Sequence, residues 1–575
     1  MPVAPVSSRM QPGAAAAHPI FGGSDPRRYP TTASRDATLS TSALDSTGTR
    51  TVVGRGSRTA RMRSRFNSRA KSAALRMRAC RADVAPRVPR AIRLAALLLG
   101  TFLPSACTRS SPNDLALALS RMQASCLVIV LDAGGAAHVG SYGYTRGTTP
   151  NLDRLAAEGF LFERVYSQGS STAISAPSYL TGLYPRSLAR WGGEDGRAGA
   201  LDAGMVATFE AWRRRDPQSP LLLAEAFRAR GFRTAGFSEN GVMGSTFGFD
   251  FGFEHFVEGG GPGEGVTGSE KVARLAREWM SAKHDSRFFA YLHFLRPHGP
   301  YTPPEDVARR FRPAGYQGAL IPDIRTLAAI EGKRLSLTAD DRDFLVSQYD
   351  ANLFYADQLV GTLLDGLAQE GVLDRTLVVV TADHGEAFGQ HGEFGHNSTL
   401  YEEMVRVPLI VRFPPRAPVR PARVATPVAL VDLFPTLVSL FFLKAEPPRA
   451  DGLSLVPLLQ DPRAPWERGL IFAERLGSVA AIGREYKYIA HPPAGGGDWR
   501  EELYNLPADP GEQRDLSEVE RDTVQAMRRR VDAFMGGSPG NIGLESAAGS
   551  LSEEQRRRLK SLGYLGGPED EPAAK

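Results

Sequence analysis

Two strongly apolar runs that each end in an acidic residue constrain the fold of this chain more than any other feature. The runs are "SCLVIVLD", residues 125–132, and "TLVVVTADHG", residues 376–385. Continuous apolar runs of this length are typical of strands that are buried on both faces of a parallel sheet. Because the runs end in Asp132 and in the pair Asp383–His384, the sequence places two carboxylates and an imidazole at the carboxyl ends of buried strands.

The same pattern recurs along the middle of the chain. Helical patterns at 269–282 and 340–369 separate further short apolar runs, and "TPNLDRLAAEG" predicts a capped helix that stops at Gly159. The other runs are "GFRTAGFSEN", "RFFAYLHFLRPHGPY" and "VPLIVRF". Strands that alternate with helices over roughly 300 residues predict an α/β domain with a parallel sheet. In open sheets of this kind, ligands bind beside the carboxyl ends of the strands.

The basic charge of the chain is concentrated in its first 106 residues. That segment holds 18 Lys and Arg against 4 Asp and Glu, a net of +14, so the total of +6 leaves −8 for the remaining residues. The globular part is therefore acidic, and we expect no nucleic-acid partner. Residues 1–75 are rich in Ser, Thr, Ala, Gly, Pro and Arg without apolar periodicity, which predicts either a disordered leader or a start codon assigned too early.

A secretory signal is predicted at the end of this leader, in "RVPRAIRLAALLLGTFLPSAC", residues 87–107. Three arginines precede an apolar run from Leu94 to Leu103, and small residues lead into Cys107. The run is too short to span a bilayer. We expect an exported protein of the periplasm or cell envelope, with a possible lipid anchor at Cys107 and a tether over residues 107–124. An uncleaved membrane anchor is the alternative.

Five segments together carry a resemblance to a known family. They are "LDAGGAAHVGSYGYTRGTTPNLDRLAAEG", "LTGLYP", "RPHGPY", "TADHGEAFGQHGEFGHNSTLYEEMVRVPLIVR" and "ELYNLPADPGEQRDLS". In this order they resemble the sulfatase family of the alkaline phosphatase superfamily, over about residues 125–520. The resemblance implies a doubly wound, mostly parallel α/β domain at 125–435, a smaller C-terminal subdomain at 436–535, and a tail at 536–575.

The resemblance also implies roles for five residues. Asp132, Asp383 and His384 match ligands of a divalent metal ion, for which calcium, manganese and zinc remain open. His298, in "RPHGPY", matches a histidine that contacts the sulfuryl or phosphoryl oxygens of the substrate. His396 matches a basic group near the leaving-group oxygen, where it would donate a proton. A single metal ion is expected, because the segment "HFLRPH" does not offer a convincing second set of ligands.

The expected nucleophile departs from the family pattern. Sulfatases oxidise the Cys or Ser of a Cys/Ser-x-Pro-x-Arg motif to formylglycine, but this chain has "SSTAISAPSYLTGLYPRS". The family spacing to "LTG" places Thr172 at the nucleophile, with Ile174 and Ala176 where Pro and Arg are required. A second register starts at Ser175 but has Tyr179 in place of the Arg. Neither register fits formylglycine, so we expect a non-formylglycine variant in which Thr172 is both nucleophile and metal ligand.

Three functions remain open at this point. The first is a hydrolase of sulfate or phosphate esters, acting on a small molecule, a glycan or a lipid through Thr172. The second is a transferase of phospho-headgroups in the cell envelope, which usually has several membrane helices. The third is a catalytically inactive binding protein, because Ala137 stands where relatives often carry Asp and the maturation motif is missing. The ester's alcohol part and the oligomeric state have no readable signal.

Overall fold

The computed structural model describes residues 112–189, 220–259, 268–282, 285–442, 449–493 and 498–536. All of them belong to one compact unit, Ser105–Lys575. The predicted leader, the signal segment and Cys107 lie outside the described residues, as does the predicted tail beyond Gly536. Within the described ranges, no helix combines the length and the apolar composition needed to cross a membrane.

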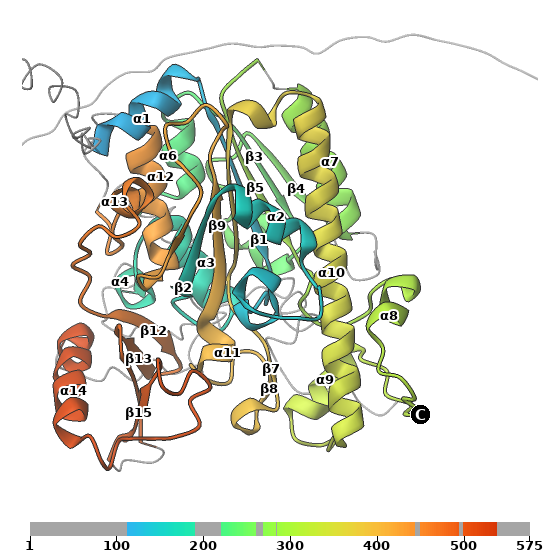
Figure 1. Ribbon diagram of the computed structural model, residues 1–575, viewed down its shortest axis with the longest axis vertical. Coiled ribbons are helices and arrows are strands. Elements are labelled where there is room, and N and C mark those ends of the chain that lie inside the picture. The colour runs from blue at the N-terminus through green and yellow to red at the C-terminus, as the bar shows by residue number, and fades with distance from the viewer. Residues whose placement is uncertain are drawn as a thin grey trace, which may run out of the picture. The chain divides into compact units, whose positions relative to one another are not determined.

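A nine-stranded sheet forms the centre of the fold (Figure 1). Its strand order is β10-β2-β9-β6-β1-β5-β3-β4, and β11 also pairs with β2. Strand β9 runs antiparallel to both of its neighbours, and the other pairs are parallel. The strands are β1 (Ser125–Leu131), β2 (Phe160–Tyr166), β3 (Arg233–Ser238), β4 (His255–Glu258), β5 (Phe288–Phe294), β6 (Thr376–Ala382), β9 (Arg406–Arg412), β10 (Ala422–Val424) and β11 (Val428–Ala429).

Helices cover both faces of this sheet, as the side chains of β1 show. Cys126, Val128 and Val130 join one core cluster, whereas the residues between them join another on the opposite face. The first face is covered by α1 (Pro112–Arg121), α3 (Thr172–Thr181), α4 (Pro185–Ala189), α6 (Leu223–Arg228), α12 (Leu433–Phe441) and α13 (Val456–Gln460). The second is covered by α2 (Pro150–Glu158), α7 (Gly268–Ala282) and α10 (Ala339–Gln369). The predicted doubly wound, mostly parallel α/β fold is confirmed.

The helices agree with the sequence predictions at three places and differ at one. The helices predicted at 269–282 and 340–369, and the one ending at Gly159, are present as α7, α10 and α2. Part of the segment that we expected to be a tether is instead helix α1. Leu115 and Leu119 lie one helical turn apart and are 2% and 1% exposed, because they pack into the core beside α12 and α13.

A small antiparallel sheet follows in the chain. Its strands are β12 (Ile471–Arg475), β13 (Ser478–Ile482), β14 (Tyr486–His491) and β15 (Arg500–Asn505), in that order. Helix α14 (Arg521–Met535) packs its apolar face on one side of them. Helices α12 and α13 belong to the core of the large sheet, so this C-terminal subdomain starts at about residue 471 among the described residues, with α12 crossing the boundary that we expected at 436.

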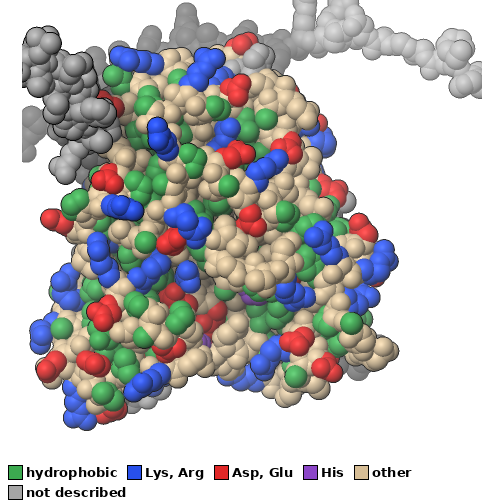
Figure 2. Space-filling model, in the orientation of Figure 1, with side chains coloured by type: hydrophobic (Ala, Val, Ile, Leu, Met, Phe, Trp, Pro, Cys, Tyr) green, Lys and Arg blue, Asp and Glu red, His purple; other side chains and the backbone are tan. Residues whose placement is uncertain are grey.

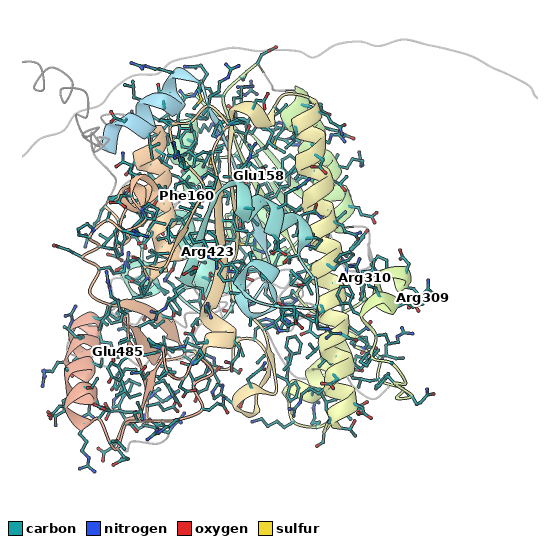
Figure 3. The ribbon with its side chains drawn as sticks, viewed as in Figure 1. Glu158, Phe160, Arg309, Arg310, Arg423 and Glu485 are labelled. Atoms are coloured by element: carbon teal, nitrogen blue, oxygen red, sulfur yellow. The ribbon has the colours of Figure 1, made fainter. Side chains whose placement is uncertain are left out.

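The segment after β6 leads from the large sheet toward this subdomain. It forms a hairpin of β7 (Ala387–Phe388) and β8 (Phe394–Gly395), followed by α11 (Glu402–Val405). Helix α9 (Ile324–Glu331) lies against β8, and α8 (Glu305–Phe311) lies against α10. Arg310 of α8, labelled in Figure 3, places its guanidinium 4.3 Å from the ring centre of Phe354 on α10.

Candidate active site

Four neighbouring strands deliver polar side chains to one edge of the large sheet. Asp132 follows β1, and Asp383 with His384 follow β6, the neighbour of β1. On its other side β1 pairs with β5, which carries His293 near its end, and β5 pairs with β3, which is followed by Asn240. Because the strands are parallel, their carboxyl ends meet at the same edge. The prediction that β1 and β6 bring Asp132 and Asp383–His384 together is confirmed.

The carboxylate of Asp132 is surrounded by nitrogen atoms. Its Oδ2 accepts a 2.5 Å hydrogen bond from Asn240 Nδ2 and lies 3.2 Å from His293 Nε2. Its Oδ1 lies 3.4 Å from His384 Nε2. Burial pushes the pKa of Asp132 upward, but His298 and the two nearer histidines outweigh burial and hold the pKa well below its ordinary value. Asp132 is therefore a buried anion.

Asp383 has one oxygen that is held by the backbone and one that is not. Its Oδ1 accepts hydrogen bonds from the N–H groups of Ala133, at 3.2 Å, and His384, at 2.9 Å. Its Oδ2 is buried and has no hydrogen-bond partner among the described residues. Asp132, His293 and Asp383 each offer a ligand atom within 4.8 Å of the others. A buried carboxylate oxygen without a hydrogen bond is costly, and the ion-pair contact of Asp383 Oδ2 with His384 Nε2 is long, at 3.7 Å, so these residues fit a divalent cation.

His384 completes the charged group. Burial alone would lower its pKa, but the carboxylates of Asp383 and Asp132 raise the pKa to about 9. Its Nδ1 lies 2.9 Å from the carbonyl oxygen of Gly385, which leaves Nε2 facing Asp132 and Thr172. The contact with the Gly385 carbonyl oxygen therefore fixes the orientation of the His384 imidazole.

Thr172 is the first residue of helix α3 and is completely buried. Its Oγ1 lies 3.4 Å from Asp132 Oδ1, 3.4 Å from His384 Nε2 and 3.4 Å from Asn240 Nδ2. By contrast, Ser175 points away from this group and donates its hydroxyl to the backbone oxygen of Asp383, at 2.5 Å. Of the two hydroxyls considered from the sequence, Thr172 is the one that meets the acidic and imidazole groups.

His298 contributes an unpaired ring nitrogen beside these residues. Its Nδ1 lies 2.7 Å from the carbonyl oxygen of Gly299, which can only accept, so this nitrogen carries the proton. Its Nε2 is buried without a hydrogen-bond partner among the described residues. Its backbone N–H donates to the carbonyl oxygen of Asp132, at 3.1 Å, which fixes the position of the loop after β5.

His396 comes from the end of the β7–β8 hairpin. Its ring centre is 4.6 Å from that of His298 and 4.8 Å from that of His384, and its Nδ1 lies 3.1 Å from Glu386 Oε1. Burial lowers the pKa of His396 below its ordinary value, and Glu386 opposes this only in part. In Figure 2, histidine atoms are visible only in small areas within a recess in the lower half of the face, beside acidic side chains.

Two residues of this arrangement were missed by the sequence reasoning. His293 was considered only as part of a second metal site and set aside, and Asn240 was not singled out. Both stand at the ends of apolar runs, in "YLHF" and "FSEN", which is the same signal that identified Asp132. To place His293 and Asn240 beside Asp132, one must also know that the strands lie in the order β3-β5-β1, which the sequence does not show.

Known proteins assign this chain to a family. The family described as "Sulfatase" matches residues 125–442, which is more than half of the chain, so the chain belongs to the sulfatase family. One curated relative is the choline-sulfatase of Rhizobium meliloti (strain 1021), with 30% identity over 287 residues. The alignment covers 46% of this chain and 52% of that protein, so the chain spans about half the length of this relative.

Two solved structures illustrate the shared fold. The phosphonate monoester hydrolase of Agrobacterium radiobacter superposes with a TM-score of 0.57 at 20% identity, covering 72% of this chain and 95% of that chain. A protein solved with its substrate D-glucosamine-2-N,6-O-disulfate superposes with a TM-score of 0.58 at 18% identity, covering 73% of this chain and 100% of that chain. At these identities the likeness concerns the fold.

Proposed function

We propose that this protein is a metal-dependent ester hydrolase in which Thr172 attacks a sulfate or phosphate ester. The observation that carries the proposal is the place of Thr172 Oγ1, buried at the start of α3 and 3.4 Å from both Asp132 and His384. Asp132, Asp383, His384 and Thr172 would hold one divalent ion, with His293 beside Asp132. When bound, such an ion supplies positive charge that lowers the pKa of a hydroxyl and neutralises ester oxygens.

The surrounding side chains have distinct roles in this proposal. Asp132 and His384 flank the hydroxyl of Thr172 and orient its oxygen toward the ester. His396, held through Nδ1 by Glu386, directs its other nitrogen to the leaving oxygen and gives it a proton. The lowered pKa of His396 does not oppose this role, because the negative charge of a bound ester favours the protonated imidazole. His298 Nε2 faces the same region and contacts an oxygen of the transferred group.

The chemistry of a plain hydroxyl favours phosphorus over sulfur. After the hydroxyl of Thr172 has lost its proton to water, Thr172 Oγ bonds to the central atom, the bond to the leaving oxygen breaks, and His396 gives that oxygen a proton. Water must then attack the same central atom and release Thr172, because threonine has no gem-diol that could expel the group by carbonyl formation. Attack on a sulfate ester of threonine is slow, so we expect phosphodiesters or phosphomonoesters to be better substrates than aryl sulfates.

The test is a substrate panel with the purified protein. It contains an aryl sulfate, a phosphomonoester, a phosphodiester, a phosphonate monoester and a sulfated amino sugar, each assayed with manganese, zinc and calcium. Hydrolysis of a phosphorus ester, with unmodified Thr172 and Ser175 by intact mass, is the expected result. Sulfatase activity far above phosphatase activity would contradict the phosphorus preference. A protein that binds no metal and cleaves none of the panel would instead be the inactive binding protein.

We also propose that the protein is exported and acts in the periplasm or cell envelope, on a small-molecule, glycan or lipid ester. The arginines, the apolar run from Leu94 to Leu103 and Cys107 support this proposal. Mass spectrometry of the protein from native envelopes should find no peptides from residues 1–75. Metabolic labelling with a fatty acid tests whether Cys107 is acylated, and peptides from the leader in the mature protein would overturn export by this signal.

A further inference from the structure

The tip of the β7–β8 hairpin docks on the C-terminal subdomain through one histidine. His391 lies in the short helical turn Gln390–Gly392, and its φ of 51° is left-handed. Its Nδ1 lies 2.8 Å from Glu403 Oε1, in α11, and its Nε2 lies 3.0 Å from the carbonyl oxygen of Glu512, after β15. Its ring stacks on that of Tyr401, with 3.7 Å between the ring centres. One side chain therefore joins the hairpin to two other segments.

The hydrogen bonds of His391 define its protonation state. A backbone carbonyl only accepts, and an ionised carboxylate only accepts, so both ring nitrogens must carry hydrogen. That condition is met only by the imidazolium. The geometry assigns a cation to His391 in the docked hairpin, independently of any titration.

The charges that face His391 favour this cation. Glu403 contacts the His391 ring through its carboxylate. Glu512 contacts the ring through its backbone carbonyl and carries its own carboxylate on the same residue. Burial would lower the pKa of His391, but Glu403 and Glu512 raise it above its ordinary value. The one other cation among these groups is Lys487 of β14, completely buried, 2.9 Å from Glu512 Oε1 and 3.3 Å from Glu402 Oε1. Without the imidazolium, the ammonium of Lys487 would be left beside Glu402, Glu403 and Glu512, and burial already raises the pKa of Glu512 to about 7.

The docked hairpin carries a residue of the proposed mechanism. His396 directly follows β8, five residues beyond His391 along the same segment. On either side of the hairpin the segment is fixed by backbone bonds, from Gly385 N–H to Met404 O at 2.7 Å and from Asn397 N–H to Ser170 O at 2.8 Å. Between these bonds, the contacts of His391 hold the hairpin tip against the C-terminal subdomain.

We propose that His391 is a positioning residue, whose imidazolium latches the hairpin to the C-terminal subdomain and thereby fixes the place of His396. The proposal rests on the proposed role of His396 in catalysis. The latch is complete below the ordinary pKa of histidine, and it is lost as the pH rises through the raised pKa of His391 in the folded protein, because deprotonation removes one donor. Loss of a charge-assisted hydrogen bond shifts the equilibrium between the docked and the undocked hairpin by about 10- to 100-fold.

Three variants separate this role from a merely structural one. His391→Asn keeps a residue that tolerates the left-handed backbone but cannot bridge both acceptors. Glu403→Gln keeps an oxygen that accepts from Nδ1 but removes its charge, and it should lower the pH at which the latch is lost. His255→Asn, at an exposed histidine on edge strand β4, is the matched control.

The measurements are nitrogen NMR of labelled histidines, amide exchange and steady-state kinetics against pH. We expect His391 to give imidazolium signals at neutral pH in the parent. In His391→Asn, residues 387–397 should exchange about tenfold faster or more, the His396 signal should move, and kcat should fall with KM nearly unchanged. A neutral His391 at pH 7 would overturn the proposal. So would unchanged exchange, His396 signal and kcat in His391→Asn. If no ester is cleaved, the proposed function fails, while the NMR and exchange results still decide whether the latch exists.

Discussion

The amide of Asn240 is expected to stabilise both the fold and the nucleophile, and its two ends can be tested separately. Its Oδ1 accepts from the backbone N–H of Val242, at 2.7 Å, and caps the turn Gly241–Met243. Its Nδ2 donates to Asp132 and lies 3.4 Å from Thr172 Oγ1. Asn240→Ala removes both functions, whereas Asn240→Asp keeps the capping oxygen and removes the donor.

The magnitudes follow from these contacts. A hydrogen bond to a charged group contributes about 1.5–3 kcal/mol, which corresponds to about a 10- to 150-fold loss in kcat/KM if it acts on the nucleophile. Loss of the cap costs about 0.5–2 kcal/mol of unfolding free energy. Asn240→Ala should therefore be slower and less stable than the parent. Asn240→Asp should be at least as slow, because a carboxylate beside Thr172 disfavours its ionised oxygen; it keeps the cap, but its carboxylate against buried Asp132 should lower the unfolding free energy in the absence of metal.

The assay combines urea unfolding with kinetics on the best ester of the panel at saturating metal. Chelator competition in the same variants shows whether metal affinity has changed. If Asn240→Asp keeps kcat/KM within about twofold of the parent at saturating metal, the donor end of Asn240 has no role at the nucleophile and the argument from its geometry is wrong.

Three other predictions concern the metal and a buried ion pair. Asp383→Ala should lose tightly bound metal by elemental analysis, because Asp383 provides a buried carboxylate oxygen that accepts no hydrogen bond, and full stoichiometry in the variant would refute its assignment. Metal binding at pH 7–8 should release about one proton from His384, because its pKa without metal is about 9. Calorimetry in buffers of different ionisation enthalpy measures the number of protons released. Arg186→Met should reduce the unfolding free energy by about 3–5 kcal/mol, because Glu474 is 1% exposed and pairs with Arg186. Adding Glu474→Gln to this variant should recover part of the lost free energy. If the single and the double variant are equally stable, the buried charge of Glu474 is not the reason for the loss.

The sequence predicted the parts of the site that depend on local pattern. Asp132 and Asp383–His384 end apolar runs, and parallel strands carry such residues to the same edge, so the strand assignment predicted a common edge, whereas the direct pairing of β1 with β6 is seen only in the structure. The family spacing that selected Thr172 over Ser175 agrees with the structure in one respect, because Thr172 faces the acidic group and Ser175 faces a carbonyl.

The remaining parts depend on long-range contacts that no local pattern contains. His293 and Asn240 reach Asp132 because β5 lies next to β1 in the sheet and β3 lies next to β5. The order of these strands along the chain does not show that they are neighbours. Strand β9 has the same apolar run whichever way it is directed, so its antiparallel orientation was not readable. Helix α1 was taken for a tether because its buried face, with Leu115 and Leu119, becomes evident only when its packing partners α12 and α13 are known.

The central claim is that the unmodified hydroxyl of Thr172 forms the covalent bond to the substrate. Rapid quenching of turnover with the best phosphorus ester, followed by peptide mass spectrometry, tests it most directly. We expect a phosphoryl increment on the peptide that contains Thr172. The increment should be absent in Thr172→Ala, whose kcat should fall by about three orders of magnitude or more, and present in Ser175→Ala. Formylglycine at Ser175, or full turnover by Thr172→Ala, would contradict the account.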